Sequence, residues 1–163
     1  MQMRWTRREL LGAAAALAAF PALPATMLHK AVPASGQPLP VIGMGTWQTF
    51  NVGSDPQLRA ARTEVLRAFF AHGGGLVDCS PMYGSSAAVM GHALAQLGHP
   101  KGLVSAEKIW TRDGDAGRRQ LAEQAVAWNI KAFDLVQVHN LLAWDEHLDT
   151  LRAMKTAGEV QYL

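Results

Sequence analysis

The 163-residue chain contains a single cysteine, Cys79, and only 17% of its residues are charged. One cysteine cannot form a disulfide within the chain, so a disulfide-stabilised scaffold is excluded. Fifteen lysines and arginines against thirteen acids give a net charge of +2, which is too small to indicate a nucleic-acid or acidic-membrane surface. The 49% apolar content excludes a disordered chain, and together with the low charge it indicates one segment rich in apolar residues.

This apolar segment lies near the N-terminus, between a basic start and a proline. Arg4, Arg7 and Arg8 precede an alanine-rich run over residues 12–20, which ends at Pro21. A membrane span needs about 20 consecutive apolar residues, so the run is too short to cross a bilayer. A basic start followed by a short apolar run is typical of a removable export signal.

Residues 6–11 (Thr-Arg-Arg-Glu-Leu-Leu) resemble the twin-arginine signal, which sends folded proteins across a bacterial inner membrane. The alternative is an ordinary basic leader that happens to contain paired arginines. Ala25 and Ala34 both end small-residue patterns suited to cleavage, so two cleavage positions stay open. We interpret residues 1–34 as an export signal and the start of a linker. We therefore predict a periplasmic location, with no stable membrane span after signal removal and a folded domain over residues 35–163.

After a proline-rich segment over residues 29–40, interpreted as a linker, short β-rich runs alternate with helical patterns. The expected strands cover 39–44, 76–80, 103–108, 133–139 and 159–163, and the expected helices cover 57–72, 85–97, 115–129 and 145–157. The pattern amounts to four βα units followed by one more strand. Such alternation predicts a parallel α/β sheet with covering helices, either open and doubly wound or closed into a barrel.

Titratable residues occupy the C-terminal ends of three successive expected strands. Side chains alternate between the two faces of a strand, which places Asp78, Lys108 and His139 each at the end of one face. A single strand-end histidine is usually a structural residue with a hydrogen-bond partner. Parallel α/β folds, however, bind ligands at this end, and barrel enzymes take catalytic groups from several strands. Three such residues at equivalent positions therefore favour an active site.

Tyr83 lies in the loop after the second expected main strand, on the same edge of the sheet. A free tyrosine hydroxyl is too weak an acid to match neutral pH. A neighbouring ammonium such as that of Lys108 strengthens it, and Asp78 can keep the lysine charged and in place. The arrangement predicts a general acid that protonates an oxygen. The alternative is a half-buried aromatic residue that anchors its loop.

Four segments of the chain resemble the aldo-keto reductase family. They are residues 43–47 (Gly-Met-Gly-Thr-Trp), 78–86 (Asp-Cys-Ser-Pro-Met-Tyr-Gly-Ser-Ser), 106–108 (Ala-Glu-Lys) and 138–140 (Val-His-Asn). The similarity covers residues from about 39 to 163. The resemblance implies an NADPH-dependent carbonyl reductase with a (β/α)8 TIM barrel, of which this chain supplies the first four βα units and the fifth strand.

The resemblance also implies a role for each of the four strand-end and loop residues. Hydride passes from the nicotinamide to the carbonyl carbon of an aldehyde or ketone, and Tyr83 delivers the proton to the carbonyl oxygen. Lys108 and Asp78 tune the tyrosine, and His139 orients the carbonyl. The positions that match the family's cofactor site are Gly45, Thr46 and Asp78.

The expected substrate pocket lies beside these residues. Trp47 and Asn140 match positions that line the family's pocket, and Trp110, just past the strand-end lysine, is expected at the pocket rim. No metal site is predicted, because the histidines show no metal-ligand spacing with one another or with Cys79. Cys79 has the opposite strand parity to Asp78 and is expected to pack beneath a helix.

The length of the chain sets an expectation about completeness. Such a barrel typically needs about 250 residues, and later strands and loops of the family carry most of the cofactor contacts. We therefore expect a truncated, inactive N-terminal portion that binds NADPH weakly or not at all. Two alternatives stay open. One is a non-catalytic half-barrel that pairs with itself or another chain through exposed sheet edges. The other is an unrelated βα enzyme of hydrolysis or aldol chemistry.

Overall fold

The computed structural model describes residues 27–163, and the apolar run and the twin-arginine-like segment lie outside these described residues. The main sheet is parallel and follows chain order. Its strands are β3 (Met44–Gly45), β4 (Leu76–Asp78), β5 (Val104–Ile109) and β6 (Leu135–Val138). Because each strand lies next to the one that follows it in sequence, the sheet has the topology of a barrel wall. The structure confirms the expected α/β class and partial barrel.

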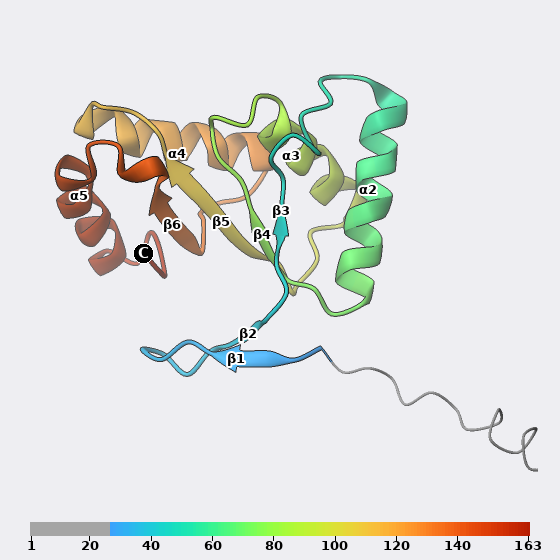
Figure 1. Ribbon diagram of the computed structural model, residues 1–163, viewed down its shortest axis with the longest axis horizontal. Coiled ribbons are helices and arrows are strands. Elements are labelled where there is room, and N and C mark those ends of the chain that lie inside the picture. Colours follow the sequence, from blue (N-terminus) through green and yellow to red (C-terminus); the bar gives the residue numbers. More distant parts are fainter. Residues whose placement is uncertain (1–26) are drawn as a thin grey trace, which may run out of the picture.

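Helices connect the strands and cover one face of this sheet (Figure 1). They are α2 (Pro56–Ala71), α3 (Ser86–Leu97), α4 (Gly114–Trp128) and, after β6, α5 (Trp144–Thr156). Each helix packs on its neighbours in the series, so the helices form a continuous outer layer. All four agree with the expected helices to within one residue at each end. Among residues 27–163, no helix combines the length and the apolar character needed to cross a membrane.

The helix ends follow from capping residues in the sequence. The Asp55 carboxylate accepts two main-chain N–H groups in the first turn of α2, where Pro56 stands at the first helical position. Asp113 caps α4 in the same way. Left-handed residues end two of the helices, Gly98 after α3 and Asn129 after α4.

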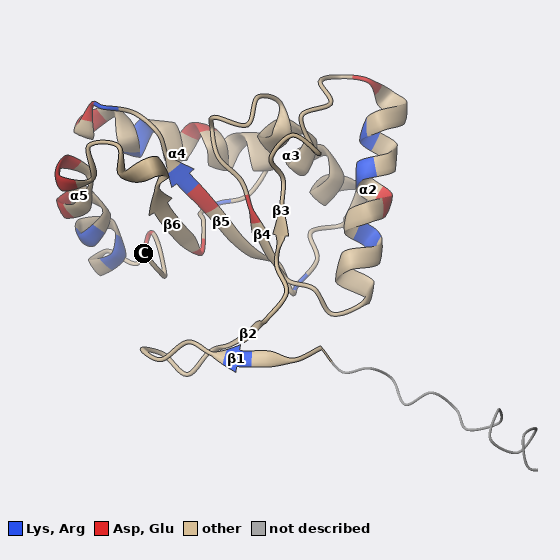
Figure 2. Ribbon diagram, viewed as in Figure 1, with Lys and Arg blue, Asp and Glu red and all other residues tan. Residues whose placement is uncertain are grey.

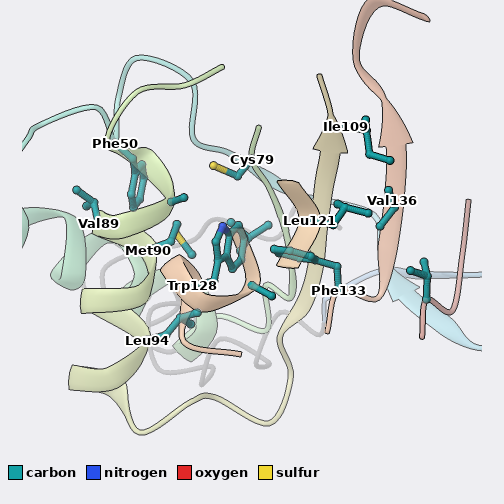
Figure 3. Close-up of a cluster of buried hydrophobic side chains, with 14 of the residues drawn as sticks. Phe50, Cys79, Val89, Met90, Leu94, Ile109, Leu121, Trp128, Phe133 and Val136 are labelled. Atoms are coloured by element: carbon teal, nitrogen blue, oxygen red, sulfur yellow. The ribbon is translucent and has the colours of Figure 1, made fainter. Parts of the chain in front are cut away.

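The core lies between the sheet and the helices, as the labelled side chains of Figure 3 show. Trp128 is fully buried and meets the Phe133 ring edge-on, with the ring centroids 5.5 Å apart. The close approach of α3 and α4 requires a glycine, because a Cβ at Gly91 would collide with the carbonyl oxygen of Ala127. This packing holds the strands in register and thereby positions their C-terminal ends.

The interpretation of residues 29–40 as a linker is wrong. They form an antiparallel hairpin of β1 (His29–Ala31) and β2 (Pro38–Pro40), which lies beyond the ends at which the main strands begin (Figure 1). Prolines fit in such a two-stranded ribbon because its outer edge needs no N–H donors. At its turn the hairpin also reaches the end of the chain, where the Tyr162 hydroxyl donates to Gln37 Oε1 at 2.6 Å.

The first and last expected strands are shorter than their sequence patterns indicate. The run over 39–44 divides between β2 and β3, because the chain leaves the hairpin at Pro40 before it enters the main sheet. The strand expected over 159–163 is present as one parallel bridge between Leu135 and Tyr162. Within residues 27–163 the wall therefore consists of four parallel strands and one further bridge beside β6.

Candidate active site

The centre of the site is an ion pair between two neighbouring strands. Asp78 pairs in register with Ala106 of β5, which places Lys108 one pleat further along. Its ammonium group lies 2.5 Å from each carboxylate oxygen of Asp78 and 2.8 Å from the Cys79 carbonyl oxygen. Figure 2 shows acidic colouring on β4 and basic colouring near the end of β5. All three ammonium protons therefore have acceptors, and the lysine is held in one orientation.

Tyr83 lies over this ion pair. The Lys108 Nζ atom is 5.2 Å from the centroid of the tyrosine ring, within the range of a cation–π contact. The loop that carries the ring is fixed on both sides, because Tyr83 N–H donates to the Ser80 carbonyl and Ser86 N–H donates to the Tyr83 carbonyl. Tyr83 is therefore both a half-buried residue that anchors its loop and a tyrosine beside an ammonium group.

His139 completes the group. It is the first residue of a short 3₁₀ turn, His139–Leu141, that directly follows β6. Its ring meets the Tyr83 ring edge-on, with the centroids 5.6 Å apart. Partial burial and the positive charge of Lys108 both lower the pKa of His139, although Asp78 acts in the opposite direction. The imidazole is therefore neutral at neutral pH.

The two positions expected beside the cofactor form the adjoining edge of the site. Gly45 pairs with Asp78 in the sheet, and no atom would lie within 4 Å of a Cβ placed on it. Thr46 is buried and donates both its N–H and its hydroxyl to the Asp78 carbonyl, at 3.1 and 2.9 Å. Thr46 thus holds the end of β4 in place, while Gly45 leaves open space next to Asp78.

The expected pocket residues all lie within two residues of a strand end. Trp47, Trp110 and Asn140 are exposed, and within residues 27–163 none of their side chains hydrogen-bonds to the four central residues. The main chain of Trp110 is clamped by the Gln120 amide, which accepts its N–H at 2.6 Å and donates to its carbonyl at 3.1 Å. A groove of about 460 Å³ opens beside Lys108, His139 and Asn140. Asn140 thus shares this groove with two of the central residues, whereas Trp47 and Trp110 do not line it.

Two residues that sequence reasoning missed support the loop after β4. The Asn51 side chain accepts the N–H and the hydroxyl of Ser85, at 3.0 and 2.9 Å. A Cβ at Gly84 would lie 2.5 Å from Asn51 Oδ1, and Gly84 has φ +61°, so a glycine is needed there. Ser80, the second residue, lies 2.6 Å from the His139 ring. Neither contact follows from local sequence, because each joins loops that are far apart in the chain.

The opposite face of the same strands is buried. Glu107 is fully buried, one carboxylate oxygen accepts the Lys108 N–H at 2.9 Å, and the other has no partner within the described part of the chain. Burial raises the pKa of Glu107 to about 7 and, with help from the Glu107 charge, the pKa of Cys79 to about 12. No three side chains able to bind a metal lie together in residues 27–163.

The structure is a parallel α/β barrel wall with a cluster of titratable side chains at its strand ends. A family model of the aldo/keto reductase family matches residues 41–163, so the chain belongs to that family. Among curated proteins none matches the chain.

Several solved structures share the fold. A candidate aldo-keto reductase from Pseudomonas aeruginosa matches with a TM-score of 0.70 and 22% identity, over 83% of this chain and 58% of that one. A thermostable aldo-keto reductase crystallised with the inhibitor epalrestat matches with a TM-score of 0.71 and 22% identity, over 83% of this chain and 52% of that one. A Klebsiella pneumoniae aldo-keto reductase in complex with NADPH matches with a TM-score of 0.68 and 22% identity, over 83% of this chain and 49% of that one. The chain thus spans about half the length of the structures it matches.

Proposed function

We propose that these residues form the proton-donating side of an NADPH-dependent reductase that converts aldehydes or ketones to alcohols. The observation that carries the proposal is the position of the Lys108 ammonium, which binds the Asp78 carboxylate and lies over the Tyr83 ring. The family membership and a relative crystallised with NADPH support the same reaction class.

Each side chain has a distinct part in the proton transfer. Tyr83 donates its hydroxyl proton to the carbonyl oxygen as the oxygen gains negative charge. Lys108 stabilises the tyrosinate that remains, and Asp78 keeps the ammonium charged and fixed. His139, being neutral, offers a ring N–H to the same oxygen. The four groups thus supply the proton and stabilise the developing charge.

The residues at the edge of the site fit a flat cofactor ring. The open space at Gly45 lies directly beside Asp78, where a side chain would otherwise block access. Gly45, Thr46 and Asp78 would hold the nicotinamide end of NADPH, which supplies the hydride when bound. The residues of this chain contribute the shape of that edge and the charge of the carboxylate.

We further propose that the 163-residue chain alone binds NADPH weakly and needs the remainder of a barrel for turnover, because it spans about half of each matched structure. Titration of the purified chain with NADPH, followed by nicotinamide fluorescence, tests this. A tight, saturable complex would contradict it. Association of the chain with itself through the free sheet edge stays a prediction, for which sedimentation of the same sample is the measurement.

The reductase proposal is tested by aldehyde-dependent NADPH oxidation in a barrel completed with a C-terminal half from a reductase. Tyr83→Phe should lower the rate about 10²- to 10⁴-fold, because the general acid is lost. Tyr162→Phe is the matched control, since it removes the other tyrosine hydroxyl far from the site. Equal rates for Tyr83→Phe and the unsubstituted barrel would refute the proposal.

Export to the periplasm by the twin-arginine route is also a proposal, and the hairpin bears on its cleavage position. Cleavage after Ala34 would remove β1 and leave β2 without a partner, whereas cleavage after Ala25 leaves the whole hairpin intact. We therefore propose cleavage after Ala25. Mass spectrometry of the protein recovered from the periplasm should give an N-terminus at Thr26. An N-terminus at Ser35, or an uncleaved cytoplasmic protein, would contradict the proposal.

A further inference from the structure

Ser80 contacts His139, and the proposed reaction gives this contact no role. Its Oγ lies 2.6 Å from Nδ1 of His139, although the two residues are 59 positions apart in the sequence. The serine is almost completely buried, with 1% of its surface exposed, so its hydroxyl must find partners within the protein. The contact therefore links the loop after β4 to the turn after β6.

The direction of this hydrogen bond follows from the other partner of Ser80. The N–H of Met82 donates to Ser80 Oγ at 3.2 Å, so the oxygen already accepts one hydrogen bond. The hydroxyl proton needs an acceptor, and within residues 27–163 the only acceptor in reach is His139 Nδ1. The reverse arrangement, with Nδ1–H as donor, would leave the hydroxyl proton buried without a partner, which costs free energy.

A neutral imidazole has one donor nitrogen and one acceptor nitrogen. If Nδ1 accepts the Ser80 proton, the ring proton resides on Nε2. The neutral state itself is favoured, since burial and the Lys108 charge lower the pKa of His139. One buried hydroxyl thus decides which nitrogen of His139 can donate a hydrogen bond.

We propose that Ser80 is a positioning residue that holds His139 as the Nε2–H tautomer, so that this N–H is presented to the substrate carbonyl oxygen. The tautomer assignment stands on the contacts of Ser80 alone. Its purpose in orienting a carbonyl rests on the proposed function. An unprotonated Nε2 at this position would repel the carbonyl lone pairs instead of binding them.

The tautomer can be measured directly by long-range ¹H–¹⁵N NMR on the chain labelled with ¹⁵N-histidine. Comparison with His139→Gln assigns the ring signals. We expect a protonated Nε2 and an acceptor Nδ1 in the unsubstituted protein, a mixture of tautomers in Ser80→Ala, and restoration in Ser80→Thr. Ser86→Ala is the matched control, because Ser86 is equally buried but donates to the Thr46 carbonyl. It should leave the His139 signals unchanged.

Two results would overturn the tautomer assignment. One is a protonated Nδ1 in the unsubstituted protein, which needs no variant to fold. The other is a Ser80→Ala spectrum with the same single tautomer. In the completed barrel, Ser80→Ala should lower kcat/KM about tenfold, mainly through KM, because one hydrogen bond to the carbonyl weakens. An unchanged kcat/KM would overturn the orienting role. A barrel with no reductase activity but an intact Nε2–H signal would refute the proposed function instead, and leave the tautomer assignment standing.

Discussion

The two faces of β4 and β5 differ sharply, although the residues on them are adjacent in the sequence. On one face, which we call the open face, Asp78 and Lys108 form an ion pair that solvent can reach. The Asp78 side chain is 34% exposed. On the other face, which we call the covered face, Cys79 and Glu107 are buried beneath the helices. Each is the sequence neighbour of one member of the ion pair. The pleat of a strand alone separates these environments. Ionisable residues therefore meet solvent on one face and the apolar core on the other.

Burial on the covered face shifts its ionisable groups toward their uncharged forms. One Glu107 oxygen has no partner in the described residues, and burial raises the pKa of this carboxyl to about 7. The same burial raises the pKa of the Cys79 thiol to about 12, so the thiolate needed for redox chemistry does not form near neutral pH. The open face, by contrast, holds two full charges that compensate each other.

The largest effect should come from placing a charge on the covered face. Cys79→Asp should reduce the free energy of unfolding by about 3–5 kcal/mol, because the new carboxylate has no cation to pair with in the core. Asp78→Asn, one residue earlier on the open face, should cost about 1 kcal/mol. Urea denaturation of both variants measures the difference. Equal destabilisation at the two positions would show that the faces are not distinct.

An intermediate effect should appear in the pH dependence of stability. The folded-state pKa of Glu107 is raised above its unfolded value of 4.5, so the folded protein retains a proton that the unfolded chain releases. Stability should therefore fall as pH rises from about 4.5 to about 7, by roughly 2–3 kcal/mol, and then level off. Urea denaturation over this pH range measures the loss.

Glu107→Gln isolates this contribution because it removes the titrating group and keeps the shape. The variant should match the unsubstituted protein at pH 4 and be more stable than it above pH 7. Glu64→Gln, on the exposed surface of α2, is the control and should leave the pH dependence unchanged. If Glu107→Gln is less stable at alkaline pH, the carboxylate has a stabilising partner and the argument fails.

The smallest effect should follow from removing the charge on the open face. Lys108→Met leaves Asp78 without its ion pair, but a partly exposed carboxylate is solvated by water. We expect a loss of about 1 kcal/mol or less in the free energy of unfolding, measured with urea at pH 7. A loss as large as that of Cys79→Asp would mean that the ion pair is a structural element of the core.

The sequence was a good guide wherever local patterns decide the structure. Apolar periodicity located the helices, and strand parity placed Asp78 and Lys108 on one face. Contacts between distant loops could not be predicted in this way. The hydrogen bond of Ser80 to His139 joins residues 59 positions apart, and nothing in either local pattern indicates it. The hairpin was missed for a different reason, because its prolines usually indicate a loop.

The central claim is that the open face carries the chemistry and the covered face does not, and two adjacent substitutions in β5 test it most directly. In the completed barrel, Lys108→Met should lower the rate of aldehyde reduction at least about 100-fold, since the tyrosine loses the ammonium beside its ring. Glu107→Gln should keep the rate within a few-fold of the unsubstituted barrel. A Glu107→Gln rate as low as that of Lys108→Met, or full activity in Lys108→Met, would contradict the account.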